Sequence, residues 1–150
     1  MRPCVVVTGA AGLIGQYLVK TAFRWAPQWD VKGLGRVDLD VTDHGAAERA
    51  WQRLQPSVVI HCAALSRTKD CEHDPQLARR VNVAATAYLA QLCKDIPFLF
   101  LSSGEVFDGR QGWYQEDDRP APINVYGKTK VEAERHVLQN PRHTVIRIVL

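Results

Sequence analysis

The chain alternates between short apolar runs and longer segments in which apolar residues recur every three or four positions. The runs predict buried strands, and the periodic segments predict helices that turn one face toward a core. Strands are expected over residues 5–7, 31–35, 37–41, 57–61, 97–103 and 144–150. Helices are expected over residues 13–25, between Asp43 and Pro56, over 74–93, and from Asn124 onward. Residues 104–122 show little periodicity, and a loop of that length in a compact domain is usually functional.

Strands that are separated by helices or long crossovers imply an α/β fold with a parallel, doubly wound sheet. We therefore expect a single Rossmann-type domain over residues 1–150, with strand order 3-2-1-4-5-6 and helices on both faces. In such a sheet the ligand cleft lies at the carboxyl ends of the first and fourth strands.

Three glycines at the spacing Gly-x-x-Gly-x-x-Gly join the first expected strand to the first expected helix. A strand that turns tightly into a helix exposes backbone N–H groups and the positive helix end, which together suit a pyrophosphate. Gly9 permits the turn, Gly12 lets the backbone approach the phosphates, and Gly15 lets helix and strand pack closely. An ordinary glycine-rich turn remains the alternative, because a glycine pattern alone is weak support.

Composition narrows the function classes. The chain has 150 residues, 46% of them hydrophobic and 23% charged, with a formal net charge of +3 that is too small and scattered to favour nucleic acid. No apolar segment resembles a signal peptide or a membrane span. The four cysteines have no metal-like spacing, so we expect no metal site and interpret them as reduced thiols of a cytoplasmic protein.

Arg36 stands at the end of the second expected strand, 21 residues beyond Gly15. Dinucleotide-binding folds place an acid there for the ribose hydroxyls of NAD, or a basic residue nearby for the 2′-phosphate of NADP. We favour NADPH over a merely solvated arginine, because a guanidinium matches a phosphate bidentately, while NADH remains an alternative.

A phenol and an ammonium, Tyr126 and Lys130, lie one helical turn apart. A nearby ammonium and the positive end of a helix both favour phenolate, so the pKa of Tyr126 is expected to fall toward neutral pH. At such a pKa, Tyr126 could exchange a proton with the carbonyl oxygen of a substrate. Ser103, at the end of an apolar strand, could hydrogen-bond the same carbonyl oxygen. We favour this catalytic set over an ordinary surface pair.

His61 is interpreted as a packed structural histidine. Asn82 lies inside an apolar helix, which predicts that its side chain has a buried polar task, structural or catalytic.

These motifs together resemble the extended short-chain dehydrogenase/reductases, and within them the dTDP-4-dehydrorhamnose reductase branch of sugar-nucleotide reductases. The resemblance spans nearly the whole chain. It rests on Thr8-Gly9-x-x-Gly12-x-x-Gly15, Leu39-Asp40-Val41-Thr42-Asp43, Pro56-Ser57-Val58-Val59-Ile60, Val81-Asn82, Val106-Phe107-Asp108-Gly109 and Asn124-Val125-Tyr126-Gly127-Lys128 with Lys130.

The resemblance implies a role for each matching position. Ser103 matches the catalytic hydroxyl, Tyr126 the general acid, and Lys130 the residue that tunes the tyrosine and holds the nicotinamide ribose. The implied cofactor contacts are Gly9, Gly12, Leu13, Ile14, Gly15, Arg36, Asp40, Val41, Cys62, Ala63, Ala64, Asn82, Tyr126 and Lys130.

Two departures lie on the expected substrate side: Gly104-Glu105 follows the catalytic serine, and Lys69 stands where an aspartate is common. Family members also continue into a C-terminal substrate domain, which we expect this chain to lack.

The expected function is NADPH-dependent reduction of a keto-sugar nucleotide. We expect no nucleic-acid or membrane partner, and a homodimer is compatible with this function. The alternatives are an NAD-dependent nucleotide-sugar epimerase or dehydratase and a non-catalytic NADP-binding regulatory subunit.

Overall fold

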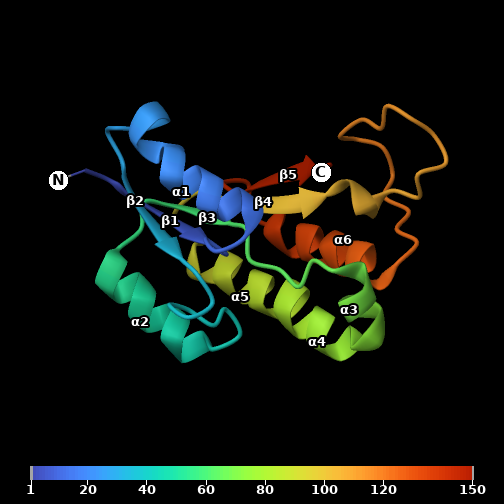
Figure 1. Cartoon of the computed structure of the whole chain (residues 1–150), viewed down its shortest axis with the longest axis horizontal. Coiled ribbons are helices and arrows are strands. Elements are labelled where there is room, and N and C mark those ends of the chain that lie inside the picture. The colour runs from blue at the N-terminus through green and yellow to red at the C-terminus, as the bar shows by residue number, and fades with distance from the viewer. Residues whose placement is uncertain (1, 150) are drawn as a thin grey trace.

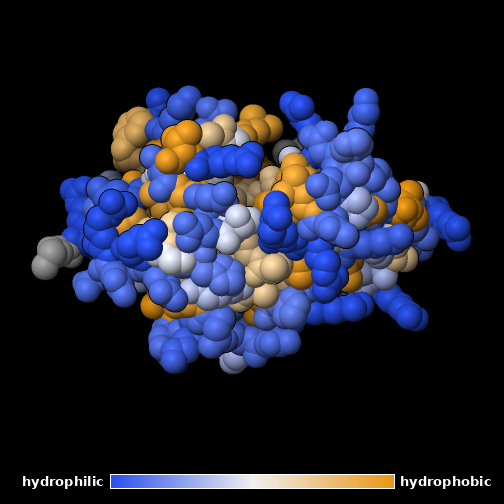
Figure 2. All heavy atoms as spheres, turned by 90° about the horizontal axis from the view of Figure 1, so that it is seen from below, coloured by the Kyte–Doolittle hydropathy of each residue, from blue (hydrophilic) through white to orange (hydrophobic). Residues whose placement is uncertain are grey.

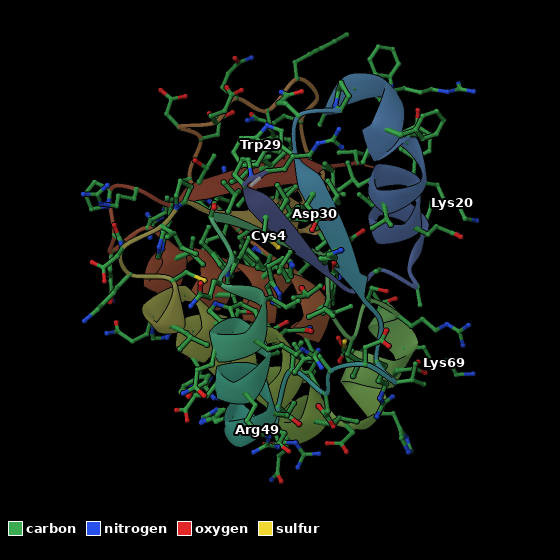
Figure 3. The ribbon with its side chains drawn as sticks, turned by 90° about the vertical axis from the view of Figure 1, so that its left-hand side faces the viewer. Cys4, Lys20, Trp29, Asp30, Arg49 and Lys69 are labelled. Carbon is green, nitrogen blue, oxygen red and sulfur yellow. The ribbon has the colours of Figure 1, made fainter. Side chains whose placement is uncertain are left out.

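A single parallel sheet forms the centre of the computed structural model, which describes residues 2–149. Its strand order is β2-β1-β3-β4-β5, and every neighbouring pair runs parallel. Cys4 and Asp30 lie side by side where β1 and β2 begin, as Figure 3 shows. The strands are β1 (Cys4–Thr8), β2 (Asp30–Leu34), β3 (Val58–His61), β4 (Phe98–Ser103) and β5 (Thr144–Ile148).

Helices cover both faces of this sheet (Figure 1). One face is covered by α1, which packs against β1 and β2, and the other by α2, α5 and α6. The helices are α1 (Leu13–Trp25), α2 (His44–Leu54), α3 (Thr68–His73), α4 (Pro75–Arg79), a π-helical turn η1 (Arg80–Ala84), α5 (Ala85–Leu92), a 3₁₀ turn η2 (Gly104–Val106) and α6 (Val125–Val137). The expected Rossmann-type class is confirmed.

Side-chain caps begin three of the helices where the sequence predicts. The Asp43 carboxylate accepts from the Ala46 N–H at 2.9 Å at the start of α2, and the Asp74 carboxylate accepts from the Leu77 N–H at 2.8 Å at the start of α4. The Asn124 side chain accepts from the Gly127 N–H at 2.7 Å and opens α6. Each cap satisfies a helix N–H that has no partner within its own helix.

The third expected strand, over residues 37–41, is wrong: this segment is a turn followed by irregular chain. Its aspartates bind the local backbone instead of leaving it free to join a sheet. The Asp38 carboxylate accepts from the Gly35 N–H at 2.8 Å, and the Asp40 carboxylate accepts from the Thr42 N–H and hydroxyl. Leu39 and Val41 are still buried in the core, which explains the alternating pattern. The five observed strands keep the predicted order with the third strand absent.

The expected helix over 74–93 also differs, because a π-helical turn at Arg80–Ala84 separates α4 from α5. The short helix α3, which precedes α4, was not predicted. The last expected strand, residues 144–150, forms β5 as far as Ile148, and Leu150 lies outside the described residues.

The main core lies between the sheet and the face covered by α2, α5 and α6. Phe98, Phe100 and Leu89 are fully buried there. Hydrophilic residues cover most of the face seen in Figure 2, with hydrophobic residues in small separate patches. Within residues 2–149 no helix is both long and apolar enough to cross a membrane.

Candidate active site

The glycine turn after β1 has the conformation that its sequence predicts. Gly9 has a φ of +67°, which side-chain-bearing residues rarely adopt, and a Cβ there would lie 2.5 Å from the Ala63 nitrogen. A Cβ at Gly15 would overlap the carbonyl oxygen of Gly9. These two glycines therefore let the turn, α1 and the end of β3 pack against one another without space for a methyl group.

The first turn of α1 presents backbone donors without a side-chain cap. Gly12 is the N-cap residue and no side chain caps the helix, and the first turn carries no acidic residue. A Cβ on Gly12 would meet only the Gly9 carbonyl, at 3.3 Å, and would otherwise extend into open space. Free N–H groups and a positive helix end beside open space fit the pyrophosphate of a dinucleotide.

A cleft of about 430 Å³ runs along the carboxyl ends of the strands from this turn to α6. All but two of the residues that the sequence predicts for cofactor binding or catalysis line it. Those lining it are Gly9, Gly12, Leu13, Ile14, Gly15, Arg36, Asp40, Val41, Cys62, Ala63, Ala64, Tyr126 and Lys130. Ser103 and Asn82 are not among the lining residues: Ser103 is half-buried beside Tyr126, and Asn82 is buried.

Tyr126, in the first turn of α6, is half-buried, and Ser103 lies beside it at the end of β4. Burial raises the pKa of the Tyr126 phenol, while the neighbouring Ser103 side chain opposes that rise. The expected lowering of the Tyr126 pKa is therefore not what the structure shows. The two hydroxyls are nevertheless adjacent, which is the arrangement that a shared carbonyl oxygen requires.

Lys130 is almost fully buried, and its ammonium donates to the Leu101 carbonyl at 2.6 Å. The same nitrogen lies 4.0 Å from the centre of the Phe100 ring. Burial lowers the pKa of Lys130 from 10.5 to about 7, while the negative charge of Glu134 acts to raise it. Lys130 is not among the groups that shift the pKa of Tyr126, where burial has the largest effect.

The buried carboxylate of Glu134 lies one turn beyond Lys130 on α6 and joins three elements. It accepts two bonds from the Arg147 guanidinium on β5, at 3.1 and 2.8 Å, and a third from the Ser102 hydroxyl on β4. Arg147 also donates to the Glu116 carbonyl in the long loop, at 3.0 Å. This network fixes α6, and with it Tyr126 and Lys130, against the last two strands.

Asn82 has a buried structural task. Its side-chain oxygen accepts from the Leu65 N–H at 2.8 Å, and its amide donates to the Leu65 carbonyl and to the Thr129 hydroxyl, both at 3.0 Å. Asn82 therefore ties the segment after β3, which lines the cleft, to the helix that carries Tyr126. The sequence singled out this residue without predicting these partners.

His61 is confirmed as a packed structural histidine. It is fully buried, with the Thr8 hydroxyl 2.7 Å from Nδ1 and the Thr86 hydroxyl 3.0 Å from Nε2. Burial lowers the pKa of His61 to about 3, so the ring is neutral. All four cysteines are free thiols, and burial raises the pKa of Cys62, beside the cleft, to about 11.

Several residues at the site were missed by sequence reasoning. Arg80 and Thr42 line the cleft beside predicted residues, and Arg80 lies only two positions before Asn82. Glu134 could have been noticed because it follows Lys130 at helical spacing. Lys69, one of the two sequence departures, lies on the exposed outer surface of α3 (Figure 3).

The whole chain, residues 1–150, matches the family described as the RmlD substrate binding domain. It is 40% identical over 144 residues to methionine adenosyltransferase 2 subunit beta of Xenopus laevis, covering 90% of this chain and 42% of that protein. It is also 40% identical over 141 residues to dTDP-4-dehydrorhamnose reductase of Streptomyces griseus, covering 92% of this chain and 46% of that protein. The chain thus spans somewhat less than half the length of these relatives.

Solved structures show the same likeness. The fold is similar to dTDP-4-dehydrorhamnose reductase from Bacillus anthracis in complex with NADP, with a TM-score of 0.92 and 27% identity over 99% of this chain and 54% of the other. The corresponding protein from Clostridium acetobutylicum has a TM-score of 0.88 and 30% identity over 96% of this chain and 52% of the other.

Proposed function

Because the chain belongs to the family of the RmlD substrate binding domain, we propose that it is the cofactor-binding part of an NADPH-dependent reductase of a keto-sugar nucleotide. The observation that carries the proposal is the single cleft that runs from the glycine turn to Tyr126 and Lys130. A cofactor-binding turn and an acid–base pair at the two ends of one cleft are what reduction of a carbonyl requires.

Each residue has a task in this proposal. The N–H groups at the start of α1 hold the pyrophosphate, Arg36 meets the 2′-phosphate, and Asp40 and Val41 flank the adenine. Lys130 would bind the nicotinamide ribose, and the bound cofactor would supply the hydride to the carbonyl carbon of the sugar. Tyr126 donates a proton to the carbonyl oxygen, which Ser103 orients. Asn82 holds the cleft wall in place from behind.

A regulatory role is the second candidate, and a specific observation favours it. The chain is as similar to methionine adenosyltransferase 2 subunit beta of Xenopus laevis as to the Streptomyces reductase, at 40% identity to each. In that case the chain would bind NADP and contact a catalytic subunit of another enzyme without turning over a sugar. Both candidates use the same cofactor cleft and differ in whether Tyr126 transfers a proton.

Substitution of Tyr126 tests the two candidates directly. Tyr126→Phe removes the proton and preserves the ring, so NADPH binding should be unchanged while reduction of dTDP-4-dehydro-6-deoxy-L-mannose falls ~10²–10⁴-fold. The ratio of turnover between the variant and the wild type is the readout.

Tyr17→Phe, at an exposed position of α1, is the matched control and should leave both properties unchanged. Equal turnover by the wild type and Tyr126→Phe would contradict the catalytic proposal. NADPH binding without turnover, combined with an effect on methionine adenosyltransferase activity, would favour the regulatory candidate.

A further inference from the structure

Two neighbouring arginines, Arg79 at the end of α4 and Arg80 at the start of η1, have different surroundings. Arg79 forms a two-pronged ion pair with Glu132 on α6. Arg80 instead lines the cleft, and its guanidinium makes no hydrogen bond or ion pair within residues 2–149. A guanidinium offers five N–H donors in a planar fork, so Arg80 presents a full set of donors to whatever enters the cleft.

The backbone explains why these neighbours diverge. Arg80 begins the π-helical turn that separates α4 from α5. A π-helical turn has a wider hydrogen-bonding pattern than an α-helix, changes the helical phase, and is frequent at functional sites. Here Arg80 and Val81 line the cleft, while the next residue, Asn82, turns inward to Leu65.

Arg36 reaches the same region from a different segment, the turn after β2. Its guanidinium also makes no hydrogen bond or ion pair within residues 2–149, and it lines the same cleft. Both Arg36 and Arg80 are close enough to Asp40 for their charges to lower the pKa of its carboxyl group, after the larger effect of its bonds from Thr42. The two arginines therefore converge on one end of the cleft.

Each acidic group at this end is engaged through one oxygen. Asp40 Oδ1 accepts from the Thr42 N–H and hydroxyl, and Asp38 Oδ2 accepts from the Gly35 N–H. Neither aspartate forms a hydrogen bond or ion pair with Arg36 or Arg80 within residues 2–149, so the donors of both guanidinium groups are free. A dianionic phosphate ester is the ligand that such a pair of forks matches best.

We propose that Arg80, together with Arg36, binds the 2′-phosphate of the adenine ribose, so that NADPH specificity is set from two segments of the chain. This inference rests on the proposed cofactor. It adds a specificity-determining residue in a helix, far in sequence from the strand end where such residues are expected.

The test titrates four nucleotides into the chain of 150 residues: NADPH, NADH, 2′,5′-ADP and 5′-AMP. Arg80→Gln should weaken NADPH and 2′,5′-ADP about tenfold, the weight of one charge-assisted hydrogen bond. NADH and 5′-AMP, which lack the 2′-phosphate, should bind as to the wild type. Arg79→Gln is the control because Arg79 is paired with Glu132, and it should leave all four affinities unchanged.

Two further results would overturn the inference. An equal loss for NADPH and NADH would show that Arg80 contacts the adenine ring or the pyrophosphate, and unchanged affinities would show that it contacts nothing. Arg36→Glu separates this failure from that of the proposed function. If Arg36→Glu moves the preference toward NADH and Arg80→Gln does not, only the inference fails. If the wild type does not prefer NADPH, both fail.

Discussion

Lys130 should make the stability of this protein depend on pH in an unusual direction. Its ammonium is buried in the wall of the cleft, where burial lowers its pKa from 10.5 to about 7. In the unfolded chain the same lysine keeps its ordinary pKa. Between these two values the unfolded state binds more protons than the folded state, so this group makes folding more favourable as pH rises.

The magnitude follows from the difference between the two pKa values, because each pKa unit corresponds to about 1.4 kcal/mol. Below the folded-state pKa, burial of the ammonium therefore costs about 3–5 kcal/mol. Most of that cost, about 3 kcal/mol, should disappear between about pH 7 and about pH 10. Lys130→Met keeps a long apolar stem and removes the charge, so it should be more stable than the wild type at neutral pH.

Other groups titrate in this window, and they act in the opposite direction. Burial raises the thiol pKa of Cys62 to about 11 and of Cys93 to about 12. A raised acid pKa contributes stability that is lost as pH rises through the folded-state value. The same cysteines are present in Lys130→Met, and the charge of Lys130 lowers the pKa of Cys62, so the difference between the two proteins reports the lysine together with this coupling.

Urea unfolding measures this difference, with tryptophan fluorescence, to which the buried Trp51 contributes, as the reporter. The free energy of unfolding of the wild type should rise by about 3 kcal/mol relative to Lys130→Met from about pH 7 to about pH 10. Lys128→Met, at an exposed position of the same helix, should show no such trend. A stability difference that does not change with pH would refute the reasoning.

Two further substitutions examine the frame of the cleft. Asn82→Leu leaves the Leu65 backbone groups and the Thr129 hydroxyl without their partner. It should therefore lower the free energy of unfolding by about 3 kcal/mol and weaken NADPH binding. A loss below about 1 kcal/mol in urea unfolding would contradict this role. Gly9→Ala combines a positive φ with a collision against Ala63, whereas Gly109→Ala has a similar φ of +71° and open space around it. Gly109→Ala should cost about 1 kcal/mol and Gly9→Ala clearly more, with loss of NADPH binding; equal costs by thermal unfolding would show that the collision does not matter.

The sequence predicted those parts of the molecule that depend on neighbouring residues. The glycine turn, the helix starts at Asp43, Asp74 and Asn124, and the strand order all follow from local chemistry and from the rules of parallel sheets. The third strand was wrong because aspartates can bind their own backbone, and an alternating pattern does not show whether they do. Trp25 fits the apolar spacing of α1 yet is 76% exposed, because periodicity does not fix how far a face extends.

The site was predictable as a set of residue types, but its electrostatics were not. The closeness of Tyr126 and Lys130 on one helix says nothing of how deeply each is buried. Burial decides the pKa of both, and it depends on the strands and loops that pack around α6. The π-helical turn that directs Arg80 to the cleft likewise has no local sequence signal known to us.

Gly127 makes none of the contacts proposed for the ligand, yet it holds the end of the cleft in shape. A Cβ at this position would overlap the Glu105 carbonyl oxygen and lie 2.9 Å from Pro122. Any larger residue would push the first turn of α6, and Tyr126 with it, away from the loop that follows β4. A variant at Gly127 found in a genetic screen would therefore behave like the loss of a catalytic residue. Classifying variants by their distance to the ligand would overlook it.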